Sequence, residues 1–224
     1  MRSGYDVSAG VIVSRLRGYV AGVELLRDPS KLEAVFEIDA AIPDQTATYA
    51  RIAMAMRVHP HAAAALAERP RLALDVPALR ALPDGTFGRA MARFLDGNGL
   101  DPRSIPTLDD GDEISWAKAH LYETHDVWHV VTGYATDIPG ELALQAFYAA
   151  QLPVRLPHFL LAGGLLHASF WDPSDFNARL AAIARGWEAG TRAKPLFGMR
   201  WAAHWGEPLE DVRARLALSN RGDC

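Results

Sequence analysis

Two histidines and two carboxylates in one short segment have the types and spacing of a metal site: His125, Asp126, His129 and Glu141. On a helix, His125 and His129 lie on one face, about 40° apart and one turn from each other. Asp126 lies about 60° from His129, near enough to serve as a third ligand or as the orienting partner of a ligand imidazole. The pattern predicts that one divalent metal ion is bound by these four residues, which would also form the catalytic centre.

Glu141 can join the histidine pair only if the chain reverses direction between them. On an unbroken helix it would lie about 18 Å along the axis from the second histidine. Gly133, Pro139 and Gly140 favour a break there, followed by a helix with Glu141 in its opening turn. We therefore predict a metal site between two consecutive antiparallel helices. The donors are those of a zinc hydrolase with a helix-borne histidine pair and a distant glutamate, except that no Glu follows the first histidine.

A histidine pair at helical spacing is more often surface or core than ligand. Burial of two imidazoles and two carboxylates beside Trp128 would be costly without a cation, which favours the metal interpretation. The other histidines lie beside proline or on apolar helices and are predicted to be structural. They are His59, His61, His120, His158, His167 and His204.

The elements that must position these residues are predicted to be helices. Apolar residues recur at helical spacing, and alternating strand patterns are nearly absent after residues 11–13. Helical patterns cover 114–133, 142–152, 156–168, 174–190 and a last segment from about 208. No repeat or linker divides the chain. We predict an all-α, single-domain multi-helix bundle over residues 1–224.

Composition narrows the function further. The chain has 224 residues, 23 basic and 27 acidic side chains and a net charge of −4. It therefore lacks the excess of basic side chains that binding to nucleic acid requires. The only cysteine is Cys224, which excludes an intrachain disulfide and an iron–sulfur cluster. No signal peptide or membrane-spanning run of about 18 apolar residues is found, so a cytoplasmic protein is expected. The apolar run 156–166 could contact lipid, although a buried core helix is the favoured interpretation.

At His125, Asp126, His129 and Glu141 the chain resembles the coenzyme Q biosynthesis protein 4 family, whose mark is His-Asp-x-x-His followed by eleven residues and Glu. The resemblance is strongest over residues 80–218. It is carried by 83–89, 140–142, 145–148, 192–198 and Trp201.

The resemblance implies an all-helical protein of ubiquinone biosynthesis, with His125, Asp126, His129 and Glu141 at the metal-ligand positions and zinc as the usual ion. It implies a prenylated quinone precursor or isoprenoid lipid as ligand, other quinone-biosynthesis enzymes as partners, and a peripheral position on the inner membrane. A bacterial member is expected because no mitochondrial targeting segment is found. A homo-oligomer and a natural-product pathway remain open.

Two functions follow from the resemblance. One is an enzyme that oxidatively replaces a ring carboxyl by a hydroxyl at carbon 1. Because zinc supplies no oxidant, iron is the alternative metal on chemical grounds; two histidines and a carboxylate also hold iron in non-haem oxygenases. The other is a lipid-binding scaffold with a structural metal. A phosphohydrolase with a His-Asp dyad is a third, weaker interpretation, since no second dyad is evident.

Overall fold

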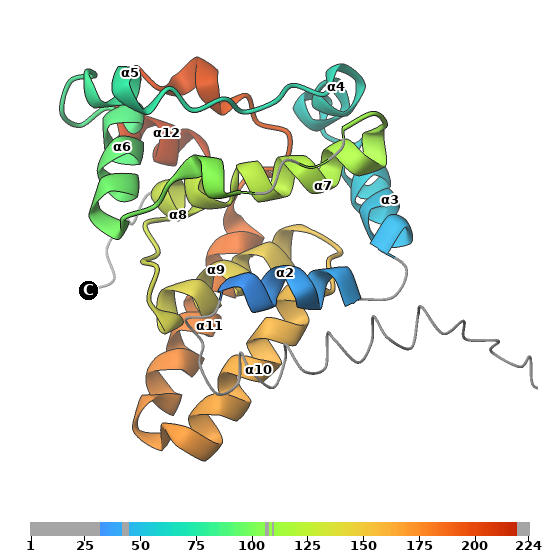
Figure 1. Cartoon of the computed structure of the whole chain (residues 1–224), viewed down its shortest axis with the longest axis vertical. Coiled ribbons are helices and arrows are strands. Elements are labelled where there is room, and N and C mark those ends of the chain that lie inside the picture. The colour runs from blue at the N-terminus through green and yellow to red at the C-terminus, as the bar shows by residue number, and fades with distance from the viewer. Residues whose placement is uncertain (1–31, 42–44, 106–107, 109, 219–224) are drawn as a thin grey trace, which may run out of the picture.

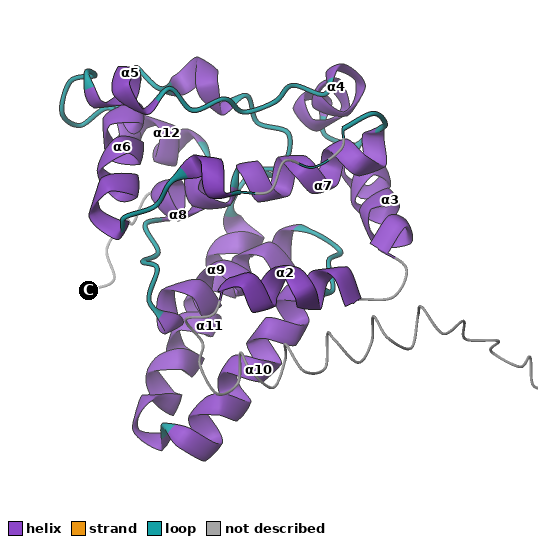
Figure 2. Cartoon of the chain, viewed as in Figure 1, coloured by secondary structure: helices purple, strands orange, loops and turns teal. Residues whose placement is uncertain are grey.

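The computed structural model of the protein describes residues 32–41, 45–105, 108 and 110–218, and their regular elements are helices (Figures 1 and 2). The α-helices are α2 (Leu32–Ala41), α3 (Gln45–Met56), α4 (Pro60–Glu68), α5 (Val76–Arg80), α6 (Phe87–Asn98), α7 (Glu113–Glu123), α8 (His125–Thr132), α9 (Ile138–Gln151), α10 (Leu156–Trp171), α11 (Phe176–Arg192) and α12 (Leu209–Arg215). Three 3₁₀ turns cover Pro102–Ser104, Pro173–Asp175 and Trp201–His204. The all-α prediction is confirmed for this part of the chain; residues 11–13 lie outside it.

The core is built from large aromatic side chains contributed by several helices. Trp116 of α7, Trp128 of α8 and Phe147 of α9 are fully buried, as are Phe87 of α6 and Trp201. Burial of such side chains stabilises the fold by about 2–3 kcal/mol each relative to exposure. This core fixes α8 against α6 and α9, the helices that surround the histidine pair.

We predicted one continuous helix from 114 to about 133. The structure divides it at Thr124 into α7 and α8. The Thr124 hydroxyl donates to the carbonyl of His120 at 2.7 Å, where it competes with the backbone ladder. Backbone hydrogen bonds still run from Thr124 N to His120 O and from Trp128 N to Thr124 O, both 3.0 Å. His125 is therefore the first residue of α8, and the backbone hydrogen bonds continue across Thr124.

Glycines allow the C-terminal helices to pack closely on α9. A Cβ at Gly186 of α11 would lie 2.0 Å from the carbonyl oxygen of Ala143, and one at Gly164 of α10 would lie 2.5 Å from Leu142. A larger residue at position 186 would displace the backbone of α9, and one at position 164 would require the Leu142 side chain to shift. Gly164 thus serves a close approach between α10 and α9.

The buried core helix that we favoured for residues 156–166 is wrong. Within α10 only Pro157 and Ala168 are buried. Figure 1 shows α10 and α11 as a hairpin that packs on α9 and whose connecting end extends beyond the other described helices. Among the described residues, other helices therefore leave much of the apolar surface of α10 uncovered. In the described part of the chain, no helix is long and apolar enough to cross a membrane.

Candidate metal centre

Three predicted ligands meet at the junction between α8 and α9. Nε2 of His129 lies 3.2 Å from Nε2 of His125 and 3.1 Å from Oε1 of Glu141, and His125 Nε2 lies 3.7 Å from Glu141 Oε2. Gly133 ends α8 in the left-handed conformation, with φ of 78°. The Asp137 carboxylate then caps α9 by accepting from Gly140 N at 2.8 Å. The predicted break therefore brings Glu141 back to the histidine pair.

Contacts around His129 fix the orientation of its ring. The Tyr134 carbonyl lies 3.0 Å from Nδ1 and can only accept, so Nδ1 carries the proton. The ring also stacks on Phe94, with 5.5 Å between ring centroids. Nε2 of a neutral His129 therefore directs its lone pair toward the other two ligands. A carbonyl that orients a histidine in this way is typical of metal ligands in proteins.

The triad has one closed side and one accessible side. The His129 side chain is 1% exposed, whereas the side chains of His125 and Glu141 are 34% and 32% exposed. A molecule from solvent can thus reach His125 and Glu141 while His129 stays covered.

Asp126 does not join the converging donor atoms. The group of ligand atoms that lie within 4.8 Å of one another contains His125, His129 and Glu141 among the described residues. Loss of hydration raises the pKa of the Asp126 carboxyl, and the neighbouring histidines act in the opposite direction. Asp126 therefore contributes charge beside the triad.

Burial and mutual charge shift the pKa values of the triad in different directions. Burial lowers the pKa of His125. Burial would also lower the pKa of His129, but its hydrogen bond to Glu141 and the charge of that carboxylate raise it overall. Burial would raise the pKa of Glu141, but the same hydrogen bond lowers it overall. The arrangement thus favours positive charge between the imidazole and the carboxylate, which a proton or a metal ion can provide.

Arg213 of α12 holds the end of α8 in place. Its guanidinium donates to the carbonyl oxygens of Val131 and Val130 at 3.0 and 2.9 Å. These carbonyls belong to the last turn of α8, where the helix leaves acceptors unpaired and favours a positive charge. The C-terminal helix therefore supports the helix that carries both histidines.

Known proteins match the chain over most of its length. A family model described as coenzyme Q (ubiquinone) biosynthesis protein Coq4 matches residues 17–221. The chain belongs to this family. The Coq4 resemblance found in the sequence is thereby confirmed.

Relatives in the Coq4 family include mitochondrial ubiquinone biosynthesis protein COQ4 homologues. The Danio rerio protein is 30% identical over 207 residues, which are 88% of this chain and 73% of that protein. The Bos taurus protein is 31% identical over 175 residues, which are 73% of this chain and 63% of that protein, so the match spans less than two thirds of the bovine length. A crystal structure assigned to ubiquinone biosynthesis, from Nostoc punctiforme PCC 73102, has a TM-score of 0.77 and 27% identity and covers 91% of this chain and 98% of its own.

Four of the remaining histidines in this Coq4 family member have protein partners away from the triad. His120 accepts from Gly198 N, His61 contacts the Pro195 carbonyl, His167 accepts from Arg179, and His204 pairs with Glu207. These contacts support the structural role that the sequence predicts for the four.

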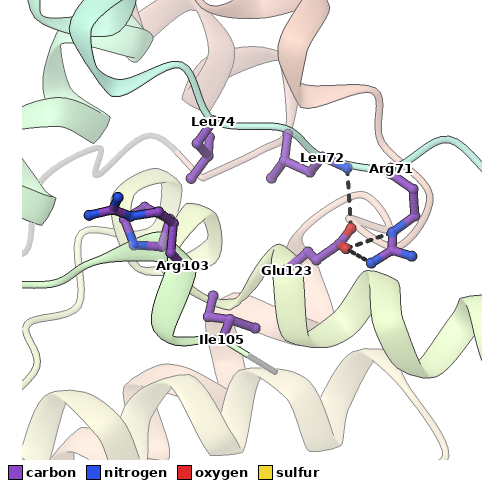
Figure 3. A pocket seen from close by; sticks show the side chains of 7 residues that line it. Arg71, Leu72, Leu74, Arg103, Ile105 and Glu123 are labelled. Carbon is purple, nitrogen blue, oxygen red and sulfur yellow. Dashed lines mark hydrogen bonds and ion pairs between the residues drawn. The ribbon is translucent and has the colours of Figure 1, made fainter. Parts of the chain in front are cut away.

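A surface pocket of about 320 Å³ has a lining distinct from the triad of His125, His129 and Glu141 (Figure 3). Its lining includes Leu72, Leu74 and Arg71, and none of the triad residues. The Arg71 guanidinium donates to carboxylates of Glu123 and Asp110, so its charge is already balanced. The pocket thus offers apolar walls and an ion pair that is satisfied within the protein.

Tyr148 is a residue near the triad that residue types alone did not single out. Its ring is parallel to that of His125, with 6.0 Å between centroids and 10° between planes. Tyr148 follows Glu141 by seven residues on α9, so both lie on one face. The seven-residue spacing from Glu141 is the sequence signal that could have indicated Tyr148.

Proposed function

We propose that this chain binds one divalent metal ion through His125, His129 and Glu141 and uses it in ubiquinone biosynthesis. The reaction we assign is the oxidative replacement of a ring carboxyl by a hydroxyl on a prenylated hydroxybenzoate. The convergence of two imidazoles and one carboxylate from α8 and α9 carries the proposal. Family membership supports the pathway.

The donor set fits a divalent cation in type and spacing. Ligand bonds of about 2.0–2.1 Å in tetrahedral geometry place ligand atoms about 3.3 Å apart. The two imidazole Nε2 atoms lie 3.2 Å apart, His129 Nε2 lies 3.1 Å from Oε1 of Glu141 and His125 Nε2 lies 3.7 Å from Oε2, and one ligand atom from each residue falls within 4.8 Å of the others. Three protein ligands leave coordination positions for a substrate, as in catalytic metal sites. Zinc follows from the family resemblance, and iron follows from the oxidative chemistry.

A bound divalent cation would supply Lewis-acid stabilisation of the negative charge on a ring carboxylate or phenolate. The protein residues around it have separate tasks. His129 is kept in one tautomer by the Tyr134 carbonyl, and Glu141 offsets part of the cationic charge. We propose that Asp126 acts on the ion through its charge and not as a direct ligand, since it lies outside the converging donor atoms.

Replacement of a ring carboxyl by a hydroxyl, with release of carbon dioxide, is a two-electron oxidation of the substrate. We propose dioxygen as the oxidant. A balanced form consumes the acid, dioxygen and water and releases the phenol, carbon dioxide and hydrogen peroxide. The reaction should therefore stop when oxygen is removed.

Metal analysis and turnover test this function together. Protein purified without chelator or affinity tag should contain about one equivalent of zinc or iron. A prenylated 4-hydroxybenzoate should then yield a prenylated hydroquinone in air but not under nitrogen. Turnover that persists after oxygen removal or metal stripping contradicts the oxidative metal mechanism.

A second candidate is a lipid-contacting scaffold, and the exposed face of the α10–α11 hairpin favours it. We call this face the hairpin apolar surface. It consists of Phe159, Leu166, Phe170, Trp171, Leu180 and Trp187, whose exposed fractions range from 45% to 73%. Helix α10 contains no Asp, Glu, Lys or Arg. Exposed aromatic and aliphatic side chains without charge are typical of membrane-contacting helices. We propose that this surface contacts a membrane or an isoprenoid tail, which would place the protein at the cytoplasmic side of the inner membrane.

His129→Ala distinguishes enzyme from scaffold. If the metal is only structural, loss of a buried ligand should unfold the protein and remove its circular dichroism signal. If the metal is catalytic, turnover should disappear while most of the helical signal remains. In cells that lack the gene, accumulation of a carboxylated prenylphenol supports the enzyme, whereas loss of all late intermediates supports the scaffold.

A further inference from the structure

Tyr148, whose ring is stacked on that of His125, carries a buried hydroxyl without a hydrogen-bond partner among the described residues. The residue is 6% exposed, and its hydroxyl is one of the buried side-chain polar atoms without a hydrogen bond in the described part of the chain. Burial of an unpaired hydroxyl costs about 1–3 kcal/mol, so such a group in a native protein requires an explanation. A bound molecule that accepts from the hydroxyl would remove this cost.

Packing fixes where the Tyr148 ring lies. The ring stacks on the indole of Trp128 at 4.2 Å with 7° between planes, and it is nearly parallel to the imidazole of His125. Trp128 itself is fully buried. The phenol therefore has little freedom to turn toward another partner.

The helix geometry of α9 directs the phenol toward the metal centre. Tyr148 and Glu141 are seven residues apart, about two turns on the same face. Side chains on a helix lean toward its N-terminus, so the ring of Tyr148 leans toward the turn that carries Glu141. A phenol hydroxyl is a hydrogen-bond donor at neutral pH, so it can donate to an anionic oxygen of a molecule bound at the triad.

We infer that the Tyr148 hydroxyl donates a hydrogen bond to the carboxylate of the molecule that occupies the metal centre. This inference rests on the proposed metal centre and adds the part of the ligand that is recognised. The ligand class is an aromatic acid, with its carboxylate held between the open side of the triad and the phenol of Tyr148.

Tyr148→Phe tests this role because it keeps the stacked ring and removes the hydroxyl alone. The probes are 4-hydroxybenzoate and phenol, which differ by the carboxylate, titrated into zinc-loaded protein and followed by calorimetry. The variant should bind 4-hydroxybenzoate about tenfold or more weakly, as expected for loss of a hydrogen bond to a charged group. Its Kd for phenol and for Zn²⁺ should stay unchanged, and its melting temperature should stay equal or rise.

Tyr122→Phe is the matched control. The Tyr122 hydroxyl is already paired within the protein, because it donates to Asp39 of α2 at 2.7 Å, so its removal should lower the melting temperature and leave the Kd for 4-hydroxybenzoate unchanged. Equal affinity of wild-type protein and Tyr148→Phe for 4-hydroxybenzoate overturns the inference, as does a wild-type protein that does not bind this acid at millimolar concentration. If the acid binds but no turnover occurs, the proposed reaction fails while the comparison of affinities still decides the role of Tyr148.

Discussion

Nε2 of His129 lies 3.1 Å from Oε1 of Glu141, although the two residues belong to different helices. The contact joins the last turn of α8 to the first turn of α9. It exists because Gly133 ends α8 in the left-handed conformation and the chain turns back before Asp137 caps α9. The triad thus depends on one short connection.

Glu141→Gln should weaken metal binding without unfolding the protein. The amide keeps the shape of the side chain but loses the negative charge that a divalent cation requires, so the Kd for Zn²⁺ should rise by more than about tenfold. Competition with a zinc chelator dye measures this change. Glu188→Gln on α11 is the control, since Glu188 is exposed and pairs with Arg192. Equal zinc affinity in wild type and Glu141→Gln would exclude Glu141 as a ligand.

Gly186→Ala should destabilise the fold. The added Cβ would lie 2.0 Å from the carbonyl oxygen of Ala143, so α11 must move away from α9. Overpacking of this kind costs about 1–3 kcal/mol in unfolding free energy. Gly97→Ala is the matched control because a Cβ at Gly97 of α6 meets nothing within 4 Å and should stabilise the helix by about 0.5–1 kcal/mol. Urea unfolding should shift in opposite directions for the two variants, and a shift in the same direction contradicts the close-packing argument.

Stability should fall in mild acid because of His120. Burial lowers the pKa of His120 to about 3, against an ordinary value of 6.5. Between these values the unfolded chain binds a proton that the folded protein excludes, so the unfolding free energy is intact above pH 6.5 and decreases as the pH falls toward 3. The slope reaches about 1.4 kcal/mol per pH unit.

Urea unfolding at pH 7 and pH 5 measures this effect. His120→Gln should be less stable than wild type at pH 7, but the loss between pH 7 and pH 5 should be smaller by about 2 kcal/mol. The exposed His158→Gln serves as control and should keep the wild-type pH dependence. An unchanged pH dependence in His120→Gln would show that other groups cause the acid sensitivity.

Substitution of Phe170 and Trp171 by Ser should weaken membrane binding. These side chains are 73% and 58% exposed at the end of α10, and each could contribute about 2 kcal/mol by leaving water for the lipid interior. Co-sedimentation with phosphatidylcholine–phosphatidylglycerol vesicles should fall more than tenfold. Met54 and Val58, with exposed fractions of 69% and 75%, provide the control pair. If both double variants lose binding equally, or if neither does, the hairpin apolar surface is not the membrane contact.

The sequence alone determined the helical class, the two histidines on one face and the break that returns Glu141. These follow from local rules: helical periodicity sets which residues share a face, and Gly133 and Pro139 limit the backbone whatever surrounds them. The family motif rests on the same residues.

Tertiary structure decided which of these side chains meet and which remain exposed. Asp126 shares the helix with the histidines, yet only Glu141 reaches them, because the position of α9 selects one side of α8. The composition of α10 resembles that of a core helix, but α10 packs on its described neighbours along one side only, and Pro157 and Ala168 are its buried residues. Tyr148 became relevant only when stacking placed its ring beside that of His125. Periodicity shows which face of a helix is apolar or chemically active, whereas the packing of other helices determines what that face meets.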